Sequence, residues 1–118
     1  MRTFTINEAG VCVNPEIDFD IKNIYENFDG EFYITVAEQG GKWATAYKCE
    51  YRNKYSSLTG NSCLPCFDTK YRRCFNTRKE AILKQIENML TWHDLPKPIQ
   101  NALKNYRNSL IFEQLKLF

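Results

Sequence analysis

Five cysteines and a single histidine are the residues of this 118-residue chain best suited to site chemistry. Cys63-Leu-Pro-Cys66 has the two-residue spacing with which a pair of thiolates holds one zinc ion. A closed zinc site needs two further ligands, for which Cys74, Cys49 and His93 are the candidates. The chain has no second Cys-x-x-Cys, however, and Cys49 falls in a predicted strand on the face expected to be buried. We therefore expect no cofactor, and keep zinc at Cys63, Cys66 and Cys74 as the alternative.

The cysteine count also bears on the redox environment of the chain. An odd number of cysteines argues against a disulfide framework, and the first residues, MRTFTINEAG, lack the apolar segment of a signal peptide. No apolar run approaches the roughly 18 residues of a membrane span. We therefore expect free thiols, a cytoplasmic location and no membrane partner. A redox role for Cys63 and Cys66 is not favoured, because such a motif normally opens a helix and this one lies among Ser, Gly and Pro.

Catalytic groups are sparse. His93 lies between two predicted helices, and nothing in the spacing places a Ser or Cys nucleophile beside it. Ile17, Phe19 and Ile21 alternate with Asp18 and Asp20 along a predicted strand, so the two carboxylates should project from the same face. There they would suit a divalent cation, although a solvated acidic face is the favoured interpretation. Gly40-Gly41 reads as a hairpin turn rather than a phosphate-binding loop between a strand and a helix. We expect a protein that is not an enzyme.

Charge is segregated along the chain, and this pattern favours a protein that binds a partner through a basic surface. Residues 1–41 hold eight Asp/Glu and two Lys/Arg, a net charge of −6, whereas residues 42–84 hold ten Lys/Arg and three Asp/Glu, a net charge of +7. In the basic segment the cations interleave with Tyr and Phe, a composition suited to phosphates and stacked bases. Arg78 and Lys79 open a predicted helix, where cations oppose the helix dipole. The residues predicted to contact a nucleic acid or nucleoprotein partner are Arg52, Lys54, Lys70, Arg72, Arg73, Arg78 and Lys79.

Two other interactions remain open. The acidic segment could imitate nucleic-acid phosphates toward a protein partner, or it could pair with the basic segment of its own chain. The apolar tail from Leu110 to Phe118 either docks on the sheet or serves as a protein–protein interaction or oligomerisation module.

The helices and strands that position these residues are predicted from the periodicity of apolar residues. Ile82, Ile86, Met89 and Leu90 form one stripe of a helix from 78 to about 91, which Thr77-Arg-Lys-Glu80 would begin as a capping box. A second helix starts near Pro98. Residues 23–29 would form a helical turn or a loop, and residues 53–70 an irregular loop. Strands are expected at 3–7, 11–13, 17–21, 31–38, 42–52 and 70–75.

Together these elements predict one α+β domain over residues 1–118, mainly β over 1–75 and helical over 77–118. We expect an antiparallel sheet of four or five strands, with the two C-terminal helices packed on one face.

The stretch from Gly41-Lys-Trp43 to Thr77-Arg-Lys-Glu-Ala-Ile82 resembles small uncharacterised domains encoded on phages and mobile elements, in which a Trp-bearing hairpin leads through a polar loop into a Thr-x-x-Glu-Ala helix. It is also similar to the strand–strand–strand–helix half of double-stranded-RNA-binding folds. It departs from those folds in lacking their N-terminal helix and a Lys-Lys-x-x-Ala pattern, so no functional residue is transferred. The resemblance implies a non-catalytic phage or mobile-element protein. The leading function that it implies is inhibition of a host defence nucleoprotein, which is how anti-CRISPR proteins act. Such a protein would act in the cytoplasm of the host cell.

Overall fold

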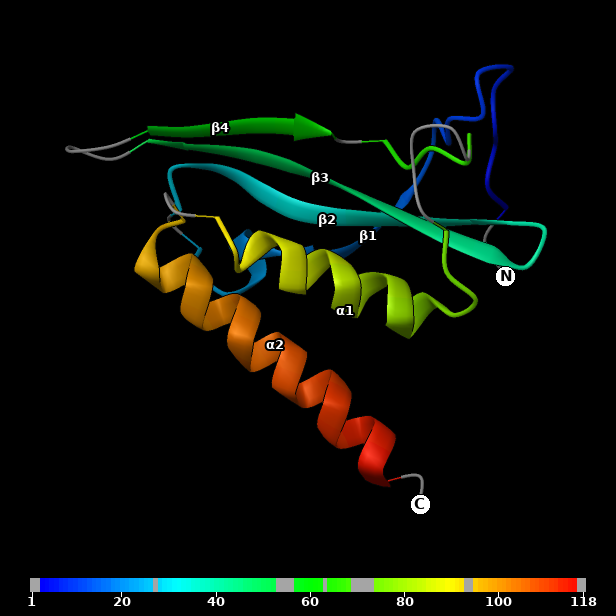
Figure 1. The fold of residues 1–118 in the computed structure, drawn as a ribbon. Helices are drawn as coiled ribbons and strands as arrows, with labels where there is room; N and C mark the ends of the chain where they lie inside the picture. The colour runs from blue at the N-terminus through cyan, green and yellow to red at the C-terminus, as the bar shows by residue number, and fades with distance from the viewer. Residues whose placement is uncertain are drawn as a thin grey trace.

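The computed structural model describes residues 3–26, 28–52, 57–62, 64–68, 74–92 and 95–116, and for residues 51, 52, 57–62 and 113–116 it describes the backbone only. Its strands form an antiparallel sheet in the order β1-β2-β3-β4, with both helices on one side (Figure 1). The predicted α+β class, with an antiparallel sheet and two C-terminal helices, is therefore confirmed. The elements are β1 (Glu16–Asp20), the 3-10 turn η1 (Ile21–Asn23), β2 (Gly30–Gln39), β3 (Lys42–Arg52), β4 (Ser57–Ser62), α1 (Arg78–Met89) and α2 (Lys97–Lys116).

The hairpin of β2 and β3 is the centre of the sheet, and it follows the sequence prediction closely. Gly40 and Gly41 connect the strands with φ angles of 59° and 79°, the left-handed backbone that a two-residue hairpin turn requires. From this turn the pairing is regular, with Phe32 opposite Cys49 and Ile34 opposite Tyr47. Apolar side chains of both strands therefore line the same face of the sheet.

The main core lies between that face and the two helices. Thr77 begins α1 as its N-cap, because its hydroxyl accepts a hydrogen bond of 3.1 Å from the backbone N–H of Glu80. This confirms the Thr77 half of the predicted capping box. The buried side chains of the core come from β1, η1, β2 and β3, from both helices and from the link between them: Phe19, Ile21, Phe32, Ile34, Val36, Cys49, Ile82, Ile86, Met89, Leu95, Ile99, Ala102 and Leu103.

The opposite face of the sheet carries small, buried side chains near the hairpin turn. Ala37, Ala44 and Ala46 have almost no exposed surface. The N-terminal segment and residues 64–68 lie on this side of the sheet (Figure 1). They are tied together because Phe67 N–H donates to the Gly10 carbonyl over 2.7 Å. Gly10 has a φ of +81°, and a Cβ there would lie 3.2 Å from the backbone nitrogen of Asp68, so the close approach requires glycine.

The structure differs from the sequence prediction at two predicted strands and one predicted loop. Residues 3–7 and 11–13 form no strand and meet only in an isolated bridge between Ile6 and Cys12. The predicted loop over 53–70 contains β4, which pairs with β3. Of the predicted strand 70–75, residues 70–73 lie outside the described residues, and Phe75 forms an isolated bridge to Trp43.

The strand β1 contains a bulge that the alternating pattern did not predict. Ile17 pairs with Thr35 and Phe19 pairs with Ile34, so Asp18 is an extra residue between two consecutive positions of β2. The bulge changes the side-chain phase: Ile17 is 52% exposed, whereas Phe19 is buried in the core. Asp18 is consequently turned toward the helices instead of outward.

Candidate binding surfaces

The predicted contact residues divide between described and undescribed parts of the chain. Lys54, Lys70, Arg72 and Arg73 lie outside the described residues. Arg52 is the last residue of β3, and only its backbone is described. Arg78 and Lys79 occupy the first turn of α1, as predicted, and they can be assessed directly.

Arg78 has intramolecular partners, and its predicted contact with an external partner stays a prediction. Its guanidinium lies 2.6 Å from Glu16 Oε1 and 3.0 Å from Asp18 Oδ2. The hydroxyl of Tyr106 in α2 donates to the other oxygen of Asp18. The Asp18 side chain is only 10% exposed, because the bulge directs it between β1 and the helices. Arg78 therefore joins β1 to α1, and a phosphate would have to displace two carboxylates to reach it.

A second ion pair neutralises another cation of the basic segment. Lys48 Nζ lies 2.6 Å from Glu31 Oε2 across the β2–β3 ladder. The hydrogen bond and the opposite charge raise the pKa of Lys48 and lower the pKa of Glu31. Part of the acidic segment therefore pairs with the basic segment, as one of the two open interpretations predicted.

Lys42 and Lys79 differ from these paired cations. Among the described residues, neither has a carboxylate within ion-pair distance, and the ammonium of Lys42 donates to the side-chain oxygen of Asn76. Trp43 and Phe75 exchange two backbone hydrogen bonds of 2.7 and 2.8 Å, which hold the chain between residues 74 and 77 beside the start of β3. We call Lys42, Lys79 and residues 74–77 the hairpin end, because Lys42 follows the Gly40-Gly41 turn and the segment bridged to Trp43 leads directly into α1.

Arg52 and the hairpin end lie at two separate ends of β3. Arg52 is nine residues along β3 from Trp43, a distance of about 30 Å in an extended strand. Cys74 lies at the opposite end of the strand, because the next residue, Phe75, is bridged to Trp43. Within the described part of the chain, a surface that included both Arg52 and the hairpin end would be elongated rather than a compact patch.

The cysteines do not form a described metal cluster. Cys63 and His93 lie outside the described residues, and among those described no three His, Cys, Asp or Glu side chains come together to hold an ion. Cys49 lies in the main core, where burial raises the pKa of its thiol to about 11, so it is not available to a site in the loop. The pKa of Cys74 is raised by burial and by the neighbouring Cys66 thiol.

The two carboxylates considered for a divalent cation are also separated. Asp18 binds Arg78 and Tyr106, whereas Asp20 caps η1 by accepting a hydrogen bond of 3.1 Å from the backbone N–H of Lys22. The expectation that Asp18 and Asp20 share one strand face was wrong, because Asp18 is the extra residue of the bulge.

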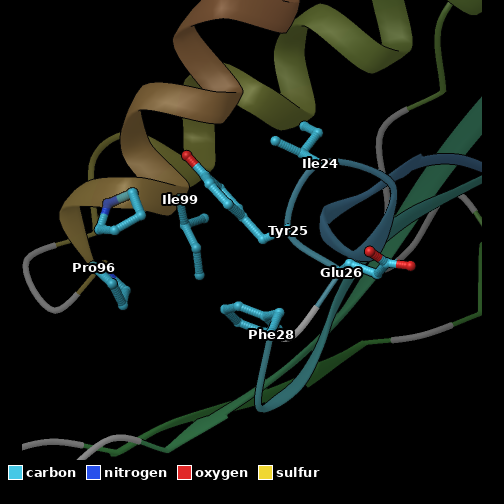
Figure 2. Close-up of a pocket in the computed structure, with 7 residues that line it drawn as sticks. Ile24, Tyr25, Glu26, Phe28, Pro96 and Ile99 are labelled. Atoms are coloured by element: carbon cyan, nitrogen blue, oxygen red, sulfur yellow. The ribbon is translucent and has the colours of Figure 1, made fainter.

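The sequence did not predict an apolar hollow beside the start of α2. It has a volume of about 510 Å³ and is lined by Ile24, Tyr25, Glu26, Phe28, Pro96, Pro98 and Ile99, which we call the α2 groove. Figure 2 shows the Tyr25 ring directed at the first turns of α2, with Phe28, Pro96 and Ile99 around the hollow. Ile24 is 50% exposed and Tyr25 is 40% exposed. The available signal was this pair of apolar residues within the segment 23–29, which was predicted only as a turn or loop.

The hollow continues along α2. A second depression of about 440 Å³ shares Ile24 and Tyr25 with the α2 groove and extends past Ala102 to Tyr106. Near the C-terminal end of the same helix, Ile111 is 42% exposed and Phe112 is 58% exposed. The apolar character that the sequence placed in the tail from Leu110 is thus displayed on the surface, at least at these two residues.

Among the helices of the described residues, none is long and apolar enough to cross a membrane. The chain matches no protein-family model, no curated protein and no solved structure at a significant level.

Proposed function

We propose that this chain is a non-catalytic binding protein that engages a nucleic acid, or a nucleoprotein complex of its host, through a basic surface at the hairpin end. The observation that carries the proposal is the backbone bridge between Trp43 and Phe75. It anchors one end of the segment that contains Lys70, Arg72 and Arg73 beside two cations that have no described carboxylate partner.

The electrostatics of the hairpin end support an anionic partner. Lys42 and Lys79 add two positive charges, and the first turn of α1 contributes the partly positive end of its helix dipole. Glu16, Asp18 and Glu31 of the acidic segment are already paired with Arg78 and Lys48. These carboxylates therefore do little to cancel the charge of the other cations.

The resemblance to small phage and mobile-element domains supports a role as a stoichiometric inhibitor of a host defence nucleoprotein, acting in the host cytoplasm. As a non-catalytic protein, the chain would act by occupying a surface of that nucleoprotein. In this proposal the binding energy comes mainly from cations facing phosphates, so affinity depends strongly on salt.

The first test is affinity capture of the full chain from cells of its natural host, with and without nuclease treatment. Loss of the captured partner on nuclease treatment indicates a nucleic acid, and retention of a ribonucleoprotein or deoxyribonucleoprotein indicates the complex. Capture of proteins that carry no nucleic acid in either sample would contradict the proposal.

The second test measures binding to single- and double-stranded oligonucleotides against salt concentration. Replacement of both Lys42 and Lys79 by Ala should weaken binding and reduce the slope of log K against log salt by about 1 to 2. Lys97→Ala, an exposed lysine at the start of α2, is the matched control and should leave the slope unchanged. Arg52→Ala tests whether the surface extends to the other end of β3. Equal effects of the double variant and the control would contradict the proposal that the binding surface lies at the hairpin end.

A further inference from the structure

We propose that a second copy of the chain occupies the α2 groove, with each copy inserting the apolar C-terminal end of its α2 into the groove of the other. The juxtaposition that leads to this proposal is an exposed apolar hollow at one end of α2 and exposed apolar side chains at the other end. The hairpin end takes no part in it, so the inference is independent of the proposed function.

The length of α2 keeps the exposed side chains of Ile111 and Phe112 away from the groove of their own chain. The helix has 20 residues and is therefore about 30 Å long, and the groove lies against its first turn, at Pro98 and Ile99. Ile111 and Phe112 lie 12 and 13 residues beyond Ile99, a rise of about 18 to 20 Å along the helix. In this proposal they therefore meet the α2 groove of another chain.

Two antiparallel copies of α2 bring the apolar end of each helix to the groove of the other chain. When such helices lie side by side around a two-fold axis near their middle, the C-terminal end of each falls beside the first turns of the other. Both tail–groove contacts are then identical, which is the closed, self-complementary arrangement of a two-fold dimer. The depression along Ala102 and Tyr106 continues the groove toward that axis, and it gives the partner helix a place to lie.

Charge complementarity favours a second copy over an unrelated apolar partner. The α2 sequence has four cations and one carboxylate, a net charge of +3, whereas residues 20–29, which include the groove residues Ile24 to Phe28, have three carboxylates and one lysine, a net charge of −2. Among the residues that the structure describes, Glu26 is the only charged side chain that lines the α2 groove. Lys116 is the only charged residue in the segment 114–118, which would enter it. An apolar tail with one cation thus matches an apolar groove with one carboxylate.

The test is sedimentation equilibrium of the full chain over a concentration range of about 1–100 μM. We expect a dimer at the upper end of the range. Ile24→Asp in the groove and Phe112→Asp in the tail should each weaken the dimer by about tenfold or more, since each buries a charge in both contacts. Val13→Asp is the matched control, because Val13 is 51% exposed, as Ile24 is, and belongs to the N-terminal segment on the other side of the sheet. Circular dichroism confirms that each variant is folded.

Mixing the two variants tests the geometry. A heterodimer of Ile24→Asp and Phe112→Asp chains has one intact tail facing one intact groove, so mixing should restore part of the dimer that neither variant forms alone. The charge pair gives a second test at surface positions: Glu26→Lys and Lys116→Glu should each weaken the dimer, and the double variant should recover it.

Three results would overturn the proposal. The first is a wild-type chain that stays monomeric over the whole range. The second is dissociation by Phe112→Asp with no effect of Ile24→Asp and of Glu26→Lys, which would place the tail on another surface. The third is a loss of the dimer in Val13→Asp as large as in the groove variants.

Discussion

Arg78 shows how the role of one residue depends on partners that are remote in the sequence. Its position in the first turn of α1 opposes the helix dipole, and from the sequence this suggested an external partner. In the folded chain the two carboxylates of β1 compensate for that position, 60 and 62 residues away. The cost at the helix start is thus offset within the molecule.

Replacement of Arg78 by Ala should therefore destabilise the fold. It leaves the Asp18 carboxylate, which is largely buried, without its cation, although Arg78 itself is 39% exposed and solvent screens part of the interaction. We expect a decrease of about 1–2 kcal/mol in the free energy of unfolding, measured by urea denaturation. Lys84→Ala, which removes the exposed pair with Glu87, is the control and should change the free energy by less than about 0.5 kcal/mol. An equally small change in both variants would show that Arg78 does not support the fold.

Cys49 gives a prediction about pH. Burial raises the pKa of its thiol from 9.0 to about 11, so the folded state keeps the proton at a pH at which an unfolded thiol has lost it. The neutral thiol contributes fully to stability below about pH 9, and this contribution is lost as the pH rises to about 11. By pH 11 the loss should reach about 2 to 3 kcal/mol relative to Cys49→Ala, since each pKa unit corresponds to about 1.4 kcal/mol. Urea denaturation at pH 8, 9, 10 and 11 compares the two proteins, and parallel curves would contradict the prediction.

At the level of the elements, the turn of the β2–β3 hairpin is the most sharply specified feature. Gly41 has a φ of +79°, and a Cβ there would have no atom within 4 Å, so a substitution is opposed by backbone conformation alone. Gly41→Ala should lower the free energy of unfolding by about 1–2 kcal/mol in thermal or urea denaturation. Gln39→Ala, an exposed position beside the turn, should change it by less than about 0.5 kcal/mol. If Gly41→Ala is as stable as wild type, the turn relaxes to a different type.

The elements also show which parts of the fold the sequence could predict. The hairpin and both helices depend on local patterns, namely alternation, a glycine turn and a helical stripe begun by Thr77, and these were predicted. The strand β4, Ser-Leu-Thr-Gly-Asn-Ser, has no such alternation, and it forms because β3 offers its backbone groups for pairing. The predicted orientation of the β1 side chains was wrong, because the spacing of apolar residues does not reveal a bulge.

The candidate surfaces were predictable to a smaller extent. The cations could be counted from the sequence, but their pairing could not, because Glu16 and Arg78 meet only through the tertiary fold. The α2 groove was missed for the same reason, since Ile24 and Tyr25 meet Ile99 across more than 70 residues of sequence.

At the scale of the whole molecule, one core holds the sheet and the helices together. Ile86 is completely buried in α1 and belongs to the cluster that includes residues of β2, β3 and α2. Ile86→Ala should therefore destabilise every element at once, by about 2–5 kcal/mol, with one cooperative transition followed by both circular dichroism and Trp fluorescence. Ile17→Ala removes the same atoms from a side chain that is 52% exposed, and it should cost less than about 1 kcal/mol. Separate transitions for the two probes would indicate that the helices and the sheet unfold independently.

The extra residue in β1 has one further consequence, for insertions and deletions. Removal of Asp18 would place Ile17 and Phe19 next to each other opposite Thr35 and Ile34, which are themselves consecutive, so the ladder would close without a gap. Loss of any other residue from this strand would move the side chains on one side of the deletion to the wrong surface of the sheet. The Asp18 position is therefore the place where β1 tolerates a shorter chain, and the penalty of that deletion would be the loss of the link to Arg78 rather than a scrambled core.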